Sequence, residues 1–373
     1  MKAAFRVDAS LQIGSGHVMR CLTLADALAA HGAQCHFISR EIVGNLLALI
    51  RQRGYVVDVL PAPTESTQVA APEGDKNDSS QLTVYEGWLG ISWQKDAEQT
   101  RAIVEKLQPD WLVVDHYALD QRWEVALRPH FKKLMVIDDL ADRVHQCDFL
   151  LDQNLGRQPQ DYVNLIPAQC KVLTGPQYAL LRPEFAALRA YSLQRRQLPV
   201  LKQVLITMGG VDQSNATGQV LQALKGCTLP QDCRISVVMG LQAPWLQQVR
   251  AQAQNMPWPT EVLVNINDMA QRMADSDLAI GAAGSTSWER CCLGLPTLMV
   301  VLADNQRLGA EALQEAQAAL LIGDVNDIAM KLPLAINAST SRHRLQEMST
   351  ATAAVTDGRG VDKVLKAMRV LND

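Results

Sequence analysis

The residues with the clearest chemical potential lie within residues 7–20, where Gly14 and Gly16 are followed directly by His17. Glycine removes the Cβ where a backbone turns sharply or a ligand comes close, and the free N–H groups at a helix start favour an anion. An imidazole titrates near neutral pH and can take a proton from water. The stretch therefore indicates a glycine loop at a ligand, with His17 at its edge as a general base.

Two other interpretations of this loop stay open. A dinucleotide-binding Gly-x-Gly-x-x-Gly loop is incomplete here, because Met19 occupies the position where a third glycine lets helix and sheet pack closely. The remaining interpretation is a plain glycine turn whose histidine is hydrogen-bonded within the fold. The rest of the chain must decide between them.

Strand and helix patterns alternate around the loop and through both halves of the chain. Residues 2–7 suit a buried strand, and residues 17–30 place apolar side chains at helical spacing. Further strands are expected at 35–39, 55–60, 110–115, 134–137, 147–152, 203–208, 234–239, 261–265, 277–281 and 297–302. Further helices are expected at 45–53, 94–107, 179–195 and 361–371. Such alternation predicts doubly wound parallel sheets of the α/β class.

The chain of 373 residues is long for a single hydrophobic core. Residues 194–199 indicate a linker, so the expected domains are 1–195 and 200–358, facing a central cleft lined by strand ends, with a C-terminal helix in 359–373. The polar composition of residues 61–80 predicts an exposed or disordered loop. Trp88 and Trp93 beside it indicate either a lid over the cleft or local packing of the next helix.

Polar side chains follow several of the expected strands. At the carboxyl end of a parallel strand such groups point into the crevice where open α/β sheets bind ligands. Asp115 and Tyr117 hold such positions, and Asp115 either faces the ligand or caps the next helix. Asp8 is a candidate to orient His17. Arg182, at the start of a helix, either meets a phosphate or is a solvated charge.

A second glycine turn, made by Gly284, Ser285 and Thr286, leads into a helix that carries Glu289. One interpretation is a capping box, in which the Thr286 hydroxyl binds a backbone N–H and Glu289 returns to the cap. In the other, helix N–H groups and hydroxyls take a diphosphate, and Glu289 takes two ribose hydroxyls. Two amides that can orient a sugar or a leaving oxygen follow the next expected strand, Asn305 and Gln306.

The composition is that of an ordinary globular protein, with 48% hydrophobic and 20% charged residues. A formal charge of −4 gives no field for nucleic acid or an anionic membrane. The eight cysteines form no Cys-x-x-Cys pair and the seven histidines no metal-binding array, so no dedicated metal cage is expected. The absence of a signal-peptide pattern and of an apolar run of about 18 residues predicts a cytoplasmic protein. The oligomeric state stays undetermined.

Several motifs together resemble the UDP-2,4-diacetamido-2,4,6-trideoxy-β-L-altropyranose hydrolases of pseudaminic acid biosynthesis, relatives of the lipid-II-forming glycosyltransferases. These motifs are 6–8 with 12–20, 114–117, 178–185, 208–212, the helix of Glu289, and 305–306. The resemblance spans nearly the whole chain. It implies a GT-B fold of two Rossmann-like domains and a role in flagellin or surface glycan modification. The polar segment 61–80 and a longer C-terminal region depart from shorter family members.

The same resemblance implies a division of the site residues between sugar and nucleotide. His17 is implied as the catalytic base. The sugar side comprises Gly14, Gly16, Arg20, Asp115, Tyr117 and Asn305. The UDP side comprises Arg182, Gly209, Gly210, Gly284, Ser285, Thr286, Glu289 and Gln306. The implied partners are a UDP-sugar and water, without a cofactor, a metal, nucleic acid or a membrane.

The implied reaction is attack of water on the anomeric carbon, with inversion and departure of UDP. A glycosidase that expels an alcohol needs a carboxylic acid as well as a base. UDP leaves as a stabilised anion, so helix ends can hold its charge and one base suffices. A UDP-sugar glycosyltransferase of the same fold and a non-catalytic nucleotide-sugar-binding module remain the alternatives. Release of UDP without an acceptor separates these three.

Overall fold

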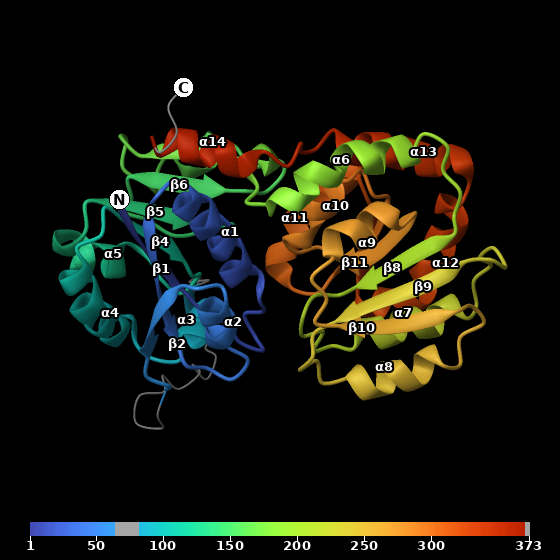
Figure 1. Cartoon of the computed structure of the whole chain (residues 1–373), viewed down its shortest axis with the longest axis horizontal. Helices are drawn as coiled ribbons and strands as arrows, with labels where there is room; N and C mark the ends of the chain where they lie inside the picture. Colours follow the sequence, from blue (N-terminus) through green and yellow to red (C-terminus); the bar gives the residue numbers. More distant parts are fainter. Residues whose placement is uncertain (64–81, 370–373) are drawn as a thin grey trace, which may run out of the picture. The chain divides into compact units, whose positions relative to one another are not determined.

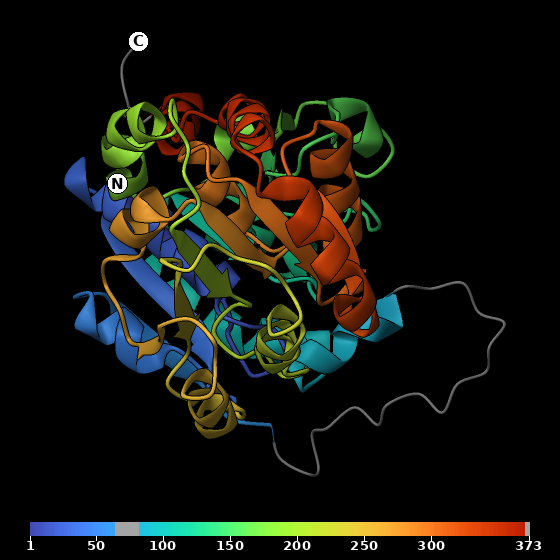
Figure 2. The same cartoon turned by 90° about the vertical axis from the view of Figure 1, so that its right-hand side faces the viewer.

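The structure, a computed structural model, describes residues 1–63 and 82–369 (Figure 1, Figure 2). The chain divides into two compact units. Unit 1 contains Met1–Leu180 and Val361–Asp373, and unit 2 contains Leu181–Gly360. The polar loop expected at 61–80 lies outside the described residues beyond Pro63.

Unit 1 is built on a seven-stranded sheet in the order β3-β2-β1-β4-β5-β6-β7, in which every pairing is parallel. The strands are β1 (Lys2–Val7), β2 (Gln34–Arg40), β3 (Val56–Leu60), β4 (Trp111–Asp115), β5 (Lys133–Ile137), β6 (Phe149–Asp152) and β7 (Lys171–Thr174). The expected strands of this half are confirmed, and β7 is an addition. Its four residues carry too few apolar side chains to form a recognisable period.

Helices cover both faces of this sheet. They are α1 (Gly16–Ala30), α2 (Leu47–Gln52), α3 (Leu82–Leu89), α4 (Trp93–Leu107), α5 (Gln121–Leu127) and α14 (Gly360–Ala367), with the 3-10 turns η1 (Arg128–His130), η2 (Pro159–Tyr162) and η3 (Pro176–Tyr178). Figure 1 shows α1 and α2 on one side of the strands and α4 and α5 on the other. Accordingly, Leu22 of α1 packs in one core with Phe5, while Trp123 of α5 packs in another with Leu112.

Unit 2 repeats the design with a six-stranded parallel sheet in the order β10-β9-β8-β11-β12-β13. The strands are β8 (Gln203–Thr207), β9 (Arg234–Met239), β10 (Thr260–Val264), β11 (Leu278–Ala282), β12 (Thr297–Val301) and β13 (Leu320–Asp324). This is the Rossmann order, in which the chain starts in the middle and winds outward in both directions. The predicted pair of doubly wound parallel sheets is therefore confirmed, and β13 is a second added edge strand.

The helices of unit 2 are α6 (Pro183–Arg195), α7 (Ala216–Leu224), α8 (Leu246–Ala253), α9 (Met269–Asp275), α10 (Thr286–Cys292), α11 (Arg307–Glu315), α12 (Ile328–Ser339) and α13 (Arg342–Ala353). Two 3-10 turns, η4 (Asp304–Gln306) and η5 (Val325–Asp327), complete the unit. Side chains of α7, α8 and α12, including Val220, Val249 and Leu332, share one core with the strands. Most strand residues in both sheets are apolar because parallel strands are buried on both faces.

The division into units differs from the expected boundary at residue 195. Helix α6 belongs to unit 2, because Arg196 at its end donates to Leu293 O at 3.0 Å and to Ser276 O at 2.7 Å. The C-terminal helix α14 belongs to unit 1, where Val364 and Leu365 are buried in the core. Unit 1 is thus discontinuous in sequence, with unit 2 inserted before its last helix.

Candidate functional site

The first candidate site lies at the carboxyl ends of β1 and β4 in unit 1. The two strands are neighbours, with Val7 opposite Asp115. The chain leaves β1 toward α1 on one face of the sheet and leaves β4 toward α5 on the other. Ligands of open parallel sheets bind at such switch points. The topology therefore brings His17 and Arg20, in the first turn of α1, to the end of β4.

A buried carboxylate joins these two side chains. Asp115 Oδ1 lies 2.6 Å from His17 Nδ1, and Arg20 donates from Nε to Asp115 Oδ2 at 2.6 Å. Burial opposes ionisation of Asp115, but its interactions with Arg20 and His17 outweigh burial and hold its pKa well below the usual value. An ionised carboxylate only accepts hydrogen bonds, so Nδ1 carries the proton. The basic nitrogen of His17 is then Nε2.

These contacts revise the expected roles of Asp115. It does not cap the following helix, because Asp120 accepts from Arg122 N at 2.8 Å at the start of α5. It is also fully buried, and both of its oxygens are bound to His17 and Arg20. Asp115 therefore holds His17 and Arg20 in place, and its contacts do not support the direct ligand contact implied by the resemblance.

Asp8, the expected partner of His17, belongs to a different buried cluster. Its carboxylate accepts from Arg6 Nη1 at 2.7 Å and from Arg40 N at 2.7 Å. Arg6 also binds Asp96 of α4, with Nη2 2.6 Å from Oδ2. Burial opposes ionisation of Asp8, but Arg6 and its neighbours hold its pKa well below the usual value. The cluster ties α4 to the sheet, and the expectation that Asp8 orients His17 is wrong.

Tyr117 lies against His17, with ring centroids 4.7 Å apart in an edge-to-face arrangement. Its hydroxyl donates to Asp139 Oδ2 at 2.6 Å, and Arg20 Nη1 lies 2.7 Å from the same oxygen. Burial and the charge of Asp139 raise the pKa of Tyr117 well above its usual value, so the phenol stays neutral. Asp139 is a site residue that the sequence prediction missed. The available signal was its position after β5, the strand next to β4.

Aromatic side chains of α3 extend the wall formed by Tyr117. Tyr85 lies 5.2 Å from Tyr117 between ring centroids, and Trp88 stacks on Tyr117 at 5.5 Å and 28°. Trp93, by contrast, faces Arg122 of α5, whose guanidinium carbon lies 5.3 Å from its ring. The two tryptophans therefore have different surroundings. Trp88 packs against Tyr117 of the site, and Trp93 packs between helices.

The glycine loop enters α1 with a left-handed residue. Gly14 has φ +78°, and its N–H donates to Ser10 O at 2.9 Å. A Cβ at this position would meet no atom within 4 Å, so the backbone angle is what requires glycine here. Gly16 begins α1, and Ser15 at the N-cap makes no side-chain capping bond. The backbone N–H groups in the first turn of α1, beside His17, therefore receive no side-chain cap from Ser15.

The second candidate site lies at the carboxyl ends of β8, β11 and β12, which are neighbours in unit 2. Residues 209–210 follow β8, Gly284 follows β11, and Asn305 and Gln306 follow β12. Gln306 Nε2 lies 3.7 Å from where a Cβ on Gly284 would be. Its Oε1 accepts from Leu302 N at 3.0 Å, which fixes the amide. The structure thus brings the predicted nucleotide-site residues at 209–210, 284 and 306, together with Asn305 of the predicted sugar side, to one end of the sheet.

The start of helix α10 does not contain the capping box that the sequence allowed for Thr286 and Glu289. Helix α10 begins at Thr286 with Ser285 as N-cap, and no side chain accepts a capping bond there. Glu289 turns instead toward Arg182, with Oε1 3.7 Å from Nη2. Arg182 also lies 3.0 Å from Glu184 Oε1, so it is paired rather than a solvated charge. Arg182 and Glu289, distant in sequence, therefore belong to the same cluster.

The charge of Glu289 should make the stability of the fold depend on pH. Burial raises its pKa to about 7 from 4.5, against the opposing charge of Arg182. A raised pKa means that Glu289 supports the fold below about pH 4.5 and that this support is lost as pH rises through about 7. We expect Glu289→Gln to gain stability over the unchanged protein between about pH 5 and pH 8, by at most roughly 3 kcal/mol.

Thermal unfolding monitored by circular dichroism at each pH measures this difference. Glu184→Gln is the matched control, because Glu184 pairs with the same Arg182 but its side chain is 42% exposed. A Glu289→Gln advantage that does not change with pH would contradict the raised pKa.

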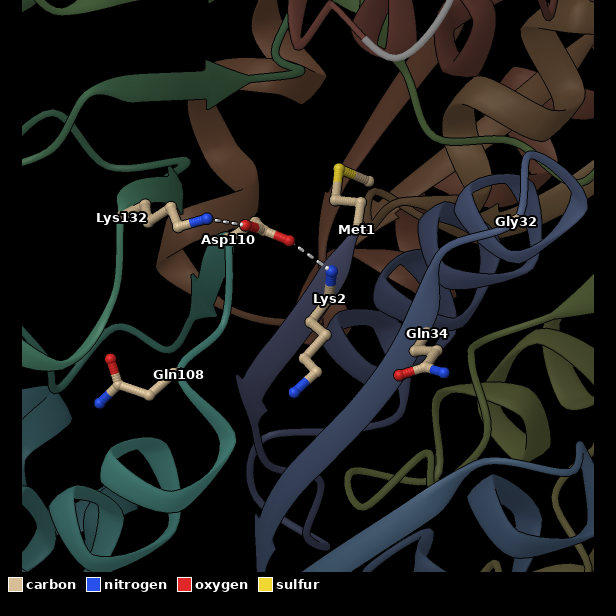
Figure 3. Close-up of a pocket in the computed structure, with 7 residues that line it drawn as sticks. All are labelled: Met1, Lys2, Gly32, Gln34, Gln108, Asp110 and Lys132. Atoms are coloured by element: carbon tan, nitrogen blue, oxygen red, sulfur yellow. Dashed lines mark hydrogen bonds and ion pairs between the residues drawn. The ribbon is translucent and has the colours of Figure 1, made fainter.

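A surface pocket of unit 1 lies at the amino ends of β1 and β4, the opposite end of these strands from His17 and Asp115 (Figure 3). Asp110 anchors it, accepting from Lys2 N at 2.7 Å and lying 2.6 Å from Lys132 Nζ. The residues that line it are Met1, Lys2, Gly32, Gln34, Gln108, Asp110 and Lys132. None of the predicted site residues is among them.

Across residues 1–63 and 82–369, no three His, Cys, Asp or Glu side chains are grouped as a metal ion would require. No helix in these ranges has the length and apolar character to cross a bilayer.

The two parallel sheets place the chain in the GT-B class of folds. The crystal structure of Acinetobacter baumannii MurG superimposes with a TM-score of 0.66, covering 99% of both chains at 18% identity. The TM-score shows a shared fold, and at 18% identity the likeness extends to the fold alone. Residues 203–364, which cover most of unit 2 and the first part of α14, match the family model of the glycosyltransferase family 28 C-terminal domain.

Two relatives are similar over most of the chain. The UDP-2,4-diacetamido-2,4,6-trideoxy-beta-L-altropyranose hydrolase of Campylobacter jejuni is 26% identical over 76% of this chain and 86% of its own length. An uncharacterized protein of Methanocaldococcus jannaschii is 24% identical over 82% of this chain. That match spans 57% of the archaeal protein.

Proposed function

We propose that the protein hydrolyses a UDP-linked 2,4-diacetamido-2,4,6-trideoxy sugar of the β-L-altropyranose type to UDP and the free sugar. The observation that carries this proposal is the buried pair of His17 and Asp115 at the end of β4. Similarity to the Campylobacter jejuni hydrolase supports the choice of substrate. The compound is one that surface glycan or flagellin modification would consume.

In the proposed reaction, unit 1 supplies the base. The Asp115 carboxylate keeps the proton of His17 on Nδ1, so Nε2 can accept a proton from water. The water oxygen forms a bond to the anomeric carbon as the carbon–oxygen bond to the diphosphate breaks. Because the Tyr117 hydroxyl donates to Asp139, its oxygen can accept a hydrogen bond from a sugar hydroxyl.

Unit 2 would hold the leaving group. The turn at Gly284–Thr286 and the glycines at 209–210 offer backbone N–H groups to the diphosphate. Glu289 would accept from ribose hydroxyls, and the amide of Gln306 would orient an oxygen. Because UDP departs as an anion held by these groups, the reaction needs no general acid on the nucleotide side.

A UDP-sugar glycosyltransferase is the second candidate. The family 28 match of residues 203–364 and the MurG-like fold favour it. It would use the same nucleotide site but transfer the sugar to an acceptor hydroxyl instead of water. A non-catalytic nucleotide-sugar-binding module would bind UDP without turnover. A coupled assay for UDP, run with the UDP-sugar and no acceptor, gives sustained release only for the hydrolase.

The fate of labelled oxygen tests where water attacks. We expect turnover in heavy-oxygen water to place the label on the sugar, with the anomeric configuration inverted, because a single displacement leaves no covalent intermediate. Mass spectrometry of both products and NMR of the first-formed anomer measure this. The rate should also be unchanged by a chelator. Label in the UDP phosphate would instead indicate attack at phosphorus, which generally needs a metal or a cationic clamp.

A further inference from the structure

We propose that Arg290 is a positioning residue for the diphosphate: its buried guanidinium braces the turn between β11 and α10 and supplies positive charge behind it. This inference rests on the proposed UDP site. Neither the motifs nor the implied family roles assign a function to Arg290.

The guanidinium connects the two ends of the turn. Nη2 donates to Ala282 O at 2.7 Å, where β11 ends, and to Ser287 Oγ at 3.0 Å, where α10 has begun. Nη1 lies 3.4 Å from Thr286 Oγ1. One rigid planar group therefore fixes both sides of the turn that carries Gly284. A shorter or uncharged side chain cannot make the same set of bonds.

The charge of this side chain has no direct ion-pair partner among the described residues, although the adjacent Glu289 interacts with it electrostatically. Arg290 is 1% exposed, and no carboxylate of the described residues forms an ion pair with it. Its Nε also has no hydrogen-bond partner there. The adjacent Glu289 is directed to Arg182 instead. A buried cation without a carboxylate bound directly to it is costly, and a bound dianion in front of the turn would offset that cost.

Two further observations support an electrostatic role. Burial lowers the pKa of Arg290 to about 10, so the charge is present at neutral pH yet poorly stabilised by the protein alone. Gly281 of β11 lies directly against it, and a Cβ there would overlap Nη1. Glycine in the middle of a buried strand is otherwise unfavourable. Its presence here is explained by the space that the guanidinium needs.

Arg196 provides a matched control for a buried arginine with a purely structural role. It lies in the same unit and is similarly buried, and burial lowers its pKa to about 10 as well. It donates to Leu293 O, Ser276 O and Met273 O at 3.0, 2.7 and 2.9 Å, which ties α6 to its neighbours. None of these acceptors belongs to the β11–α10 turn.

Calorimetric titration with UDP and with uridine separates the two roles. We expect Arg290→Gln to weaken binding of UDP by about tenfold or more, as for loss of a charged interaction, and to change binding of uridine little. Arg290→Lys, which keeps the charge, should retain part of the preference for UDP. Arg196→Gln should lower the melting temperature but leave the ratio of the two affinities unchanged.

Two results would contradict a role of Arg290 in diphosphate binding. Equal weakening of UDP and uridine in Arg290→Gln, or the same ratio change in Arg196→Gln, would reduce Arg290 to a structural side chain. If Arg290→Gln does not fold, Arg290→Lys and Gly281→Ala, which displaces the guanidinium without removing it, provide the measurement. If the unchanged protein binds no UDP, the proposed function itself fails, and the inference fails with it.

Discussion

Replacing His17 with asparagine is expected to lower the rate of UDP release by about 10²–10⁴-fold, the usual contribution of a general base. The amide can hydrogen-bond but cannot accept a proton from water. Affinity for UDP should stay nearly unchanged, because the base contributes to the transition state rather than to nucleotide binding. Steady-state assays of UDP release, with calorimetry for UDP affinity, measure the two quantities on one sample.

His36→Asn is the matched control for this substitution. His36 also pairs with an aspartate of unit 1, with Nε2 2.5 Å from Asp58 Oδ2, but it lies on β2 and Asp58 on β3. The control should keep its activity. A His17→Asn variant that retains most of its kcat would remove His17 from the mechanism.

Asp115→Asn is the second substitution with a large expected effect, again about 10²–10⁴-fold in kcat. An asparagine beside Nδ1 can present its NH₂ group, which favours the tautomer with the proton on Nε2. The base is then lost although the ring remains. The substitution also removes one of the two carboxylates paired with Arg20, so the melting temperature should fall.

A buried aspartate elsewhere in unit 1 separates stability from catalysis. Asp138 is fully buried and lies 2.9 Å from Arg143 Nη2, without contacting His17. We expect Asp138→Asn to lower the melting temperature comparably while kcat stays within a few-fold. Equal losses of kcat in the two variants would indicate a general effect of destabilising unit 1 rather than orientation of His17.

The architecture could be predicted because parallel sheets have a strong local signature. Buried strands such as β4 and β12 are nearly continuous apolar runs, and each is followed by a turn and a helix with its own spacing. The edge strands β7 and β13 escaped prediction because they are only partly buried, and β7 has only four residues. The assignment of α6 to unit 2 depends on long-range bonds of Arg196 that no local pattern contains.

For the candidate sites, the sequence identified the groups but not their partners. His17 and Asp115 were both recognisable from their strand ends and turns. Their pairing was not, because Asp8 also follows a strand beside the same loop. Only the register of β1 on β4, together with the capture of Asp8 by Arg6, assigns Asp115 to His17. Arg290 was hidden because an arginine within a helix is usually solvated.

The discontinuous composition of unit 1 has a consequence for folding during synthesis. Val364 and Leu365 fill the same core as Leu22, yet they leave the ribosome after all of unit 2. At roughly 5–20 residues per second, the ribosome needs roughly 10–40 s to make the intervening segment. Throughout that interval, the apolar face of unit 1 that α14 covers stays exposed. Unit 2 is continuous in sequence and can complete its own core during the same time. A ribosome that stalls near residue 360 therefore releases a finished second unit joined to an unfinished first one, with the apolar surface that α14 would cover exposed to chaperones and proteases.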